Sequence, residues 1–267
     1  MEKPFETFRY NHMKYTREHH MAKPFEILDG DCCVNYVNGM YMVLATSRSG
    51  HHFTKENILS WTADNENKKR LYINLENILP KNFREITSKI DFNQYPNSIY
   101  IIQIRDLLNW YATWVKHILK HYLITGIRDD VLHYSVRLSK DIDVWCALTK
   151  EYYHETNYLL DGFIRLSYDD FFKSQDYRKK ICAQIPDGVY NETKLNYVPS
   201  QADGSTWDKR TYQGMGQKMD VLGRYKSLPP QFKGALKVLK EHPEAIQLYL
   251  KHFNVTDEQK KFIDNIK

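Results

Sequence analysis

The sequence predicts an α/β protein with three layers, in which a central parallel sheet is flanked by helices. Short apolar runs typical of buried strands, such as 41–46 and 98–104, alternate with segments in which apolar residues recur at helical spacing. The first of these runs also leads into a tight turn containing Arg48, Ser49 and Gly50, and a helical pattern follows. A strand, a basic turn and a helix in this order are typical of a phosphate-binding loop.

The same two periodicities predict the elements in chain order. The segment after the strand at 98–104 carries Leu108, Tyr111 and Val115 at helical spacing, and the segment after residue 137 carries Ile142, Trp145 and Leu148 in the same way. The expected elements are a strand at 41–46, a helix at about 52–61, strands at 71–75 and 98–104, a helix at about 107–122, a helix at 137–158, a strand at 163–167, and helices at 243–251 and 257–266.

Length and composition predict a single domain over residues 1–267. A chain of this length with 42% hydrophobic residues can bury one sizeable core, and neither a linker nor a repeat divides it. Segment 187–230 is rich in Gly, Pro, Ser, Asn and Asp, and we expect it to form a long functional loop. Residues 231–267 then form a C-terminal helical cap.

The formal net charge of +5 is spread along the chain with acidic residues interleaved, which argues against a nucleic-acid-binding protein. The four cysteines lack metal-ligand spacing and are expected to be reduced thiols. No long apolar run and no signal peptide stand out, so we expect a soluble cytoplasmic protein without a membrane span. The oligomeric state stays open.

The turn at 47–50 differs from the loop of an ATPase. That loop has two glycines followed by Lys and then Ser or Thr, whereas this turn has one glycine and no such pair. A second strand end can supply another anion-binding group, since Arg105 ends the strand at 98–104 and Thr113 lies about two turns into the next helix. Each block alone is also compatible with an ordinary strand end.

Together the blocks resemble the cytosolic and Golgi sulfotransferase superfamily, whose donor is 3′-phosphoadenosine 5′-phosphosulfate (PAPS). The family's first motif is a strand, then Pro-Lys/Arg-Ser-Gly-Thr/Ser-Thr/Ser and an aromatic residue, and its second is a strand, then Arg-Asp-Pro with a Ser eight residues beyond the Arg. The matching residues are Ser47-Arg48-Ser49-Gly50-His51-His52-Phe53, and Arg105, Asp106, Leu107 and Thr113.

A bacterial and phage-like branch of these enzymes is similar at four blocks. It has Arg-Ser-Gly-His-His at the first motif, an Asn-x-Glu block, and Gly-Ser-Ser-Phe-Asp late in the chain. This sequence carries the corresponding blocks in the same order between residues 40 and 226, including Asn74-Leu75-Glu76 and Gly204-Ser205-Thr206-Trp207-Asp208. The resemblance implies a P-loop-like fold with segment 187–230 covering the donor.

The resemblance also implies site residues. The 5′-phosphosulfate is expected at Arg48 and the backbone of 49–52, and the 3′-phosphate at Arg105 and Thr113. Close backbone approach is expected at Gly204 and Ser205, and Lys209 or Arg210 would reach the 3′-phosphate. The expected donor-binding residues are Arg48, Ser49, Gly50, His51, His52, Phe53, Arg105, Thr113, Gly204, Ser205, Lys209 and Arg210.

Sulfuryl transfer needs stabilisation of the leaving bisphosphate, for which Arg48 is placed, and a base for the acceptor's proton. Glu76 is the first candidate because it follows a strand, and His51 or His52 is the rival. PAPS is the expected donor, adenosine 3′,5′-bisphosphate (PAP) the product, and no metal is expected. The acceptor is a hydroxyl or amine of a small molecule or glycan. The alternatives are a non-catalytic nucleotide-binding protein and a P-loop kinase-like protein.

Overall fold

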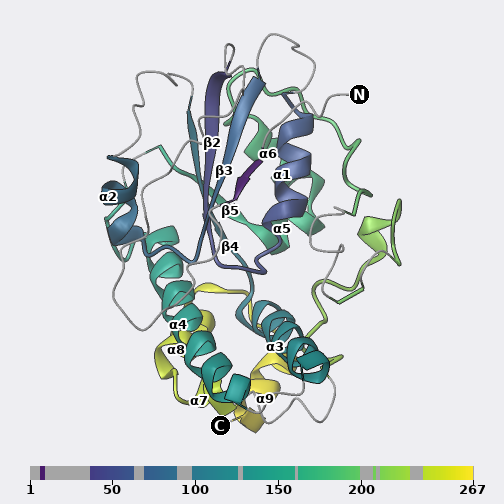
Figure 1. Cartoon of the computed structure of the whole chain (residues 1–267). Helices are drawn as coiled ribbons and strands as arrows, with labels where there is room; N and C mark the ends of the chain where they lie inside the picture. Colours follow the sequence, from purple (N-terminus) through teal and green to yellow (C-terminus); the bar gives the residue numbers. More distant parts are fainter. Residues whose placement is uncertain are drawn as a thin grey trace.

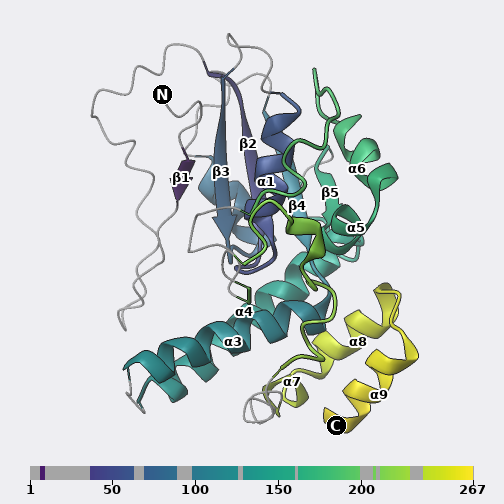
Figure 2. The same ribbon diagram turned by 90° about the vertical axis from the view of Figure 1, so that its right-hand side faces the viewer.

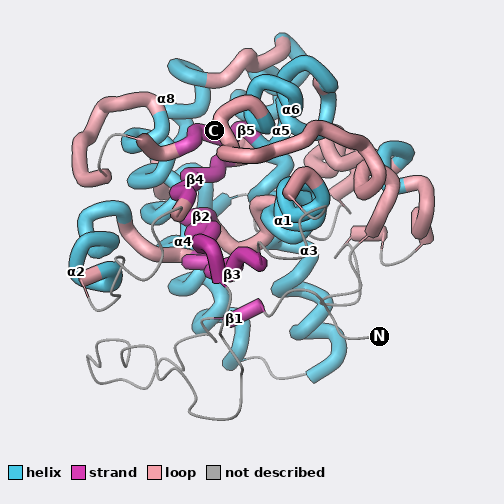
Figure 3. The backbone as a smooth tube through the Cα atoms, turned by 90° about the horizontal axis from the view of Figure 1, so that it is seen from above, coloured by secondary structure: helices cyan, strands magenta, loops and turns pink. Residues whose placement is uncertain are grey.

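A parallel five-stranded sheet forms the middle layer of the computed structural model (Figure 1), which describes residues 7–9, 37–62, 69–88, 98–125, 129–159, 162–198, 207–208, 211–228 and 237–266. Viewed along the strands, the order β1–β3–β2–β4–β5 is visible as a diagonal row (Figure 3). The strands are β1 Thr7–Arg9, β2 Val37–Ala45, β3 Lys69–Glu76, β4 Ile99–Ile104 and β5 Ile164–Ser167.

The central strands are apolar along most of their length because both faces of the sheet are covered. Tyr41, Val43 and Ala45 of β2 pack on one face, and Met42 and Leu44 pack on the other. The register aligns the strand ends, so that Ala45 of β2 is paired with Glu76 of β3 and with Gln103 of β4. The polar side chains of Glu76 and Gln103, from the two strands that flank β2, therefore lie at the carboxyl edge of the sheet.

Helices cover the two faces separately, which gives the three layers (Figure 3). The helices α1 His51–Ser60, α5 Tyr168–Lys173 and α6 Gln175–Cys182 lie on one face. The opposite face is covered by α2 Phe83–Thr87, which follows a 3-10 turn at Pro80–Asn82, and by the second half of α4 Asp129–Tyr152. The predicted α/β architecture with a central parallel sheet flanked by helices is confirmed.

A third apolar cluster lies beyond the carboxyl ends of the strands (Figures 1 and 2). It joins α3 Leu107–Thr125 and α4 to the C-terminal helices α7 Lys237–Lys240, α8 Pro243–His252 and α9 Asp257–Ile266. Trp110, Trp145 and Tyr249 are almost completely buried there. This cluster packs next to the carboxyl edge of the sheet, where the polar side chains lie.

Some details differ from the sequence predictions. The elements expected from the sequence periodicity do not include the short helices α2, α5 and α6. The cap of α5 is Ser167, whose Oγ accepts from the N–H of Asp170 at 3.3 Å. Cys146 and Cys182 are buried free thiols. Among the described residues, no helix is both long enough and apolar enough to cross a membrane.

Candidate functional site

The turn between β2 and α1 has a backbone that only particular residues accept. Arg48 has φ 67° and Gly50 has φ 90°, both in the left-handed region. A Cβ atom on Gly50 would lie 2.1 Å from the ring of Tyr168, so a larger residue is excluded by contact as well as by conformation. Gly50 is the N-cap of α1, and the N–H groups of the first turn of a helix have no carbonyl partner within it.

Three side chains fix the carbonyl oxygens of this turn. Trp110 Nε1 donates to Ser47 O at 2.8 Å, Arg105 Nη1 donates to Arg48 O at 3.0 Å, and Gln103 Nε2 donates to Ser49 O at 2.9 Å. All three donors come from β4 and the segment that follows it. A trans peptide holds its N–H opposite its C=O. The amide hydrogens of these peptide units, on Arg48, Ser49 and Gly50, therefore point away from β4 and α3. That of Ser49 donates to Thr46 O at 3.2 Å within the turn, and the direction of the others suits an anion.

The end of β3 holds the other side of the turn and orients Glu76. Asn77 has φ 58° and its Oδ1 accepts from the N–H of Ser47 at 2.9 Å, while its own N–H donates to Ala45 O at 2.9 Å. Ser47 Oγ donates to Glu76 Oε2 at 2.8 Å. This hydrogen bond fixes Oε2 of the Glu76 carboxylate, and the second oxygen, Oε1, makes a different contact.

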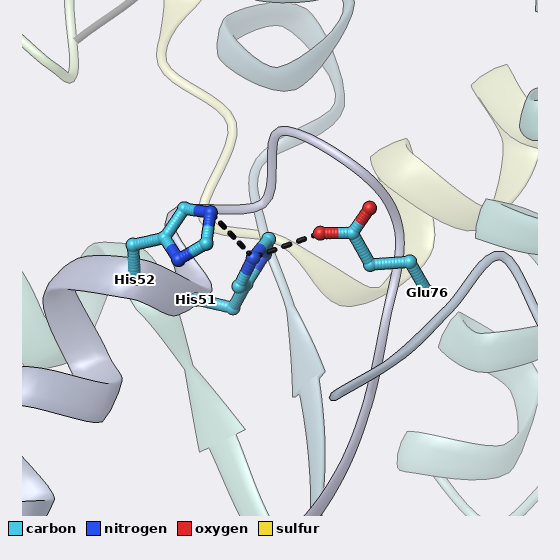
Figure 4. A group of neighbouring side chains, drawn as sticks. All are labelled: His51, His52 and Glu76. Carbon is cyan, nitrogen blue, oxygen red and sulfur yellow. Dashed lines mark hydrogen bonds and ion pairs between the residues drawn. The ribbon is translucent and has the colours of Figure 1, made fainter. Parts of the chain in front are cut away.

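That second oxygen contacts His51, which in turn contacts His52 (Figure 4). His51 lies between His52 and Glu76, with its Nε2 2.8 Å from Glu76 Oε1 and 3.1 Å from His52 Nε2. His51 is 3% exposed. Both histidines belong to the first turn of α1, and the carboxylate comes from the neighbouring strand β3. The three side chains can act as acids, bases or metal ligands.

Two guanidinium groups are buried beside the turn. Arg105 is 1% exposed and its Nη2 donates to Val221 O at 2.8 Å, in addition to its bond to the turn. Arg224 is 5% exposed, and its Nη1 lies 3.4 Å from Thr113 Oγ1. Burial, and then the charge of Arg105, lower the pKa of Arg224 to about 10. Like charges that are held together away from water favour an anionic ligand.

Residues of the segment at 207–208 adjoin this cationic group. Arg224 Nη2 donates to Asp208 Oδ2 at 3.2 Å. Lys116 Nζ donates to Trp207 O at 3.0 Å and lies 4.1 Å from the centre of the Trp207 ring. Burial lowers the pKa of Lys116, an effect that Asp208 opposes and Arg224 increases.

Arg48 extends the cationic group toward α3. Its Nη2 lies 3.0 Å from Nδ1 and 2.8 Å from Nε2 of His117. Arg48 and His117 are 69 residues apart in the chain, and the contact connects the turn to the middle of α3. The turn, α3 and segment 207–228 thus contribute to one polar region at the carboxyl edge of the sheet.

The structure brings most of the predicted site residues together. Phe53 is the exception among those described, because its side chain lies in the core, where its ring contacts those of Tyr168, Phe171 and Phe172. Gly204, Ser205, Lys209 and Arg210 lie outside the described residues. The predicted residues that meet at the sheet edge are Arg48, Ser49, Gly50, His51, His52, Glu76, Arg105 and Thr113.

Sequence reasoning missed Arg224, Lys116 and His117 as site residues. Arg224 follows Gly223 in the glycine-rich segment, which was a usable signal because that segment was already expected to cover a ligand. Lys116 and His117 lie on an amphipathic helix, where a basic residue is usually solvated. Only their contacts distinguish them, since Lys116 Nζ donates to Trp207 O and His117 contacts Arg48 Nη2.

No protein-family model and no curated protein matches the sequence. Among solved structures, the chain is similar to the sulfotransferase domain from the Synechococcus PCC 7002 olefin synthase. The TM-score is 0.44 and the sequence identity is 11%, over 80% of this chain and 94% of that domain. A match at this level does not by itself assign an activity.

Proposed function

We propose that the protein transfers a sulfuryl group from PAPS to a hydroxyl or amine of a small molecule or glycan. The observation that carries this proposal is the pair of buried, mutually repelling arginines, Arg105 and Arg224, next to a turn of the phosphate-binding type. A donor with two separated phosphate groups would place one at the turn and the other beside this pair of arginines. The ordered motifs that resemble those of sulfotransferases point to the same donor.

Each phosphate group has its own binding residues in this proposal. Arg48 and the backbone of residues 49–52 bind the 5′-phosphosulfate, with the N–H groups of residues 50–52 as donors because that of Ser49 donates to Thr46 O. Thr113 and Arg224 bind the 3′-phosphate. Arg105 donates to Arg48 O and to Val221 O, so we assign it the role of holding the turn and segment 207–228 in place around the donor. Lys209 and Arg210, together with Gly204 and Ser205, complete a cover formed by segment 187–230.

The reaction is an in-line displacement at sulfur. The acceptor oxygen or nitrogen forms a bond to sulfur, the bond from sulfur to the bridging phosphate oxygen breaks, and PAP leaves with the electron pair. Arg48 and the first turn of α1 stabilise the charge that develops on the bridging oxygen. The acceptor's proton goes to the group formed by Glu76, His51 and His52. Glu76 is the first candidate because Ser47 fixes its orientation.

Two other functions make different predictions. A kinase-like protein would prefer ATP, but the residue after Gly50 is His51 rather than the lysine that binds nucleotide phosphates in P-loop kinases. A non-catalytic nucleotide-binding protein would bind the bisphosphate and leave PAPS unchanged whatever acceptor is offered.

Titration calorimetry on the full chain, in the presence of a chelator, tests the donor assignment. We expect PAP to bind more tightly than ADP or ATP, and Arg48→Ala to weaken PAP binding at least tenfold, since charge-assisted bonds are worth about 1.5–3 kcal/mol. Arg84→Ala, an exposed arginine on α2, is the matched control and should bind as wild type. A preference for ATP would favour the kinase-like function. PAP binding without turnover of PAPS would favour the non-catalytic one.

A further inference from the structure

One hydrogen on His51 Nε2 cannot make a linear hydrogen bond to both of its neighbours. This atom is 2.8 Å from Glu76 Oε1 and 3.1 Å from His52 Nε2 (Figure 4). An imidazole nitrogen carries either a hydrogen or a lone pair. With a hydrogen it donates to Glu76 and cannot accept from His52. With a lone pair it accepts from His52 and directly faces a carboxylate oxygen. A cation that accepts electron pairs from all three atoms removes this conflict.

We propose that His51, His52 and Glu76 bind one divalent transition-metal ion of the zinc type. Their ligand atoms all lie within 4.8 Å of one another. Zinc bonds to imidazole nitrogen and carboxylate oxygen of about 2.0–2.2 Å imply tetrahedral ligand separations of about 3.3–3.6 Å. The separations at His51 are 2.8 and 3.1 Å, so small side-chain adjustments admit the ion.

The surroundings of Glu76 resemble the outer contacts of a metal ligand. Its Oε2 accepts from Ser47 Oγ, and Ser47 Oγ in turn accepts from Asn77 Nδ2 at 3.0 Å. Such hydrogen bonds fix the orientation of ligating carboxylates. Nδ1 of His51 is buried and has no hydrogen-bond partner among the described side chains and backbone. No contact of Nδ1 in that part of the chain therefore requires Nε2 to carry the ring hydrogen.

The ligand set also indicates a role. Two histidines and one glutamate leave a fourth tetrahedral position open, which is the pattern of catalytic rather than structural zinc. If the proposed sulfuryl transfer holds, an acceptor oxygen at this position would lose its proton more readily, and Glu76 would act as a ligand rather than as the base. Sensitivity of turnover to a chelator separates these two roles of Glu76.

Metal titration without any nucleotide tests the site. The full chain, without a histidine tag and stripped of metal, is titrated with Zn²⁺ in a calorimeter, and with Co²⁺ by absorption. We expect one ion per chain and the absorption bands of tetrahedral Co²⁺. His51→Ala, His52→Ala and Glu76→Gln should each lower the affinity at least about tenfold. If the buried His51→Ala variant does not fold, the partly exposed His52 and Glu76 still provide the test.

The control is a second histidine–carboxylate pair. His252 Nε2 lies 2.6 Å from Glu155 Oε1 on the surface, and His252→Ala should bind zinc as wild type does. The proposal is overturned if the wild type takes up less than one equivalent, or if the three ligand variants bind as tightly as it does. PAP binding in chelator is a separate measurement, so failure of the metal site and failure of the proposed function are distinguishable.

Discussion

Asp106 and Asp169 form a buried pair of carboxyl groups where β4 meets α3. Asp169 Oδ2 accepts from the N–H of Asp106 at 2.6 Å. Asp106 Oδ1 accepts from the N–H of Asn109 at 2.8 Å, while its Oδ2 accepts from Gln259 Nε2 at 3.1 Å and from the Tyr249 hydroxyl. Burial, and then the charge of Asp106, raise the pKa of Asp169 to about 7. Arg105 and Lys173 oppose this shift.

This pair predicts a pH dependence of stability. A carboxyl with a folded-state pKa near 7 and an ordinary value of 3.8 binds more protons in the folded protein than in the unfolded chain between these values. The free energy of unfolding attributable to Asp169 therefore falls as pH rises from about 4 to about 7. Asp169→Asn should remove this fall in the free energy of unfolding. Because Asp169 binds at most one proton, the fall is at most about 1.4 kcal/mol per pH unit.

Urea unfolding at several pH values measures this contribution. The difference in slope between wild type and Asp169→Asn is the informative quantity, because other carboxyl groups titrate in both proteins. Asp106 also has a raised pKa, caused by burial, and the two groups titrate as a pair. Parallel curves for the two proteins would show that Asp169 does not carry the dependence.

At the scale of single elements, the β2–α1 turn depends on Gly50. Gly50→Ala introduces a left-handed alanine and a Cβ atom 2.1 Å from the Tyr168 ring. We expect a loss of more than about 3 kcal/mol in the free energy of unfolding, as overpacking is added to backbone strain. Gly214→Ala is the matched control, since Gly214 has φ 77° but no atom within 4 Å of its would-be Cβ. Denaturant unfolding of both variants gives the comparison.

Gly214→Ala should lower the free energy of unfolding by only about 1–2 kcal/mol, because the left-handed conformation is unfavourable for alanine. Equal losses in the two glycine variants would mean that Tyr168 moves away without cost. In that case Tyr168 would not fix the turn, which would be held by the hydrogen bonds of Gln103, Arg105, Trp110 and Asn77.

The elements that sequence periodicity predicted are those long enough to show a period. The predicted strands at 71–75 and 98–104 correspond to β3 and β4, and the predicted helix at 107–122 corresponds to α3. The three-residue β1 and the five-residue α2 are too short for a period to be seen. The helix predicted at 137–158 starts earlier and ends earlier, as α4 at Asp129–Tyr152.

The residues of the candidate site that lie at or shortly after the end of a strand could be predicted from the sequence. Arg48, Glu76 and Arg105 each lie at the end of a strand, and parallel strands bring such ends together. Arg224 lies on the long connection between α6 and α7, after a 3-10 turn at Gly216–Lys218, and its position depends on contacts with Thr113 and Asp208. Such contacts between distant segments have no local pattern in the sequence.

At the scale of the whole molecule, the C-terminal helices support the site from outside the sheet. Tyr249 of α8 and Gln259 of α9 both donate to Asp106, which is adjacent to Arg105. Trp145 Nε1 of α4 donates to Arg105 O at 3.0 Å. The strand end that carries Arg105 is thus fixed by three helices, and the cationic group keeps its geometry before any ligand binds.

In the proposed function, this cationic group recognises a 3′-phosphate in addition to a 5′-phosphate. The most direct measurement is a calorimetric cycle with PAP and AMP, which differ only in the 3′-phosphate, on wild type and Arg224→Gln. We predict that wild type prefers PAP by about a hundredfold and that Arg224→Gln reduces this preference at least tenfold, with AMP binding unchanged. Equal binding of PAP and AMP by wild type, or an unchanged preference in Arg224→Gln, would contradict the claim.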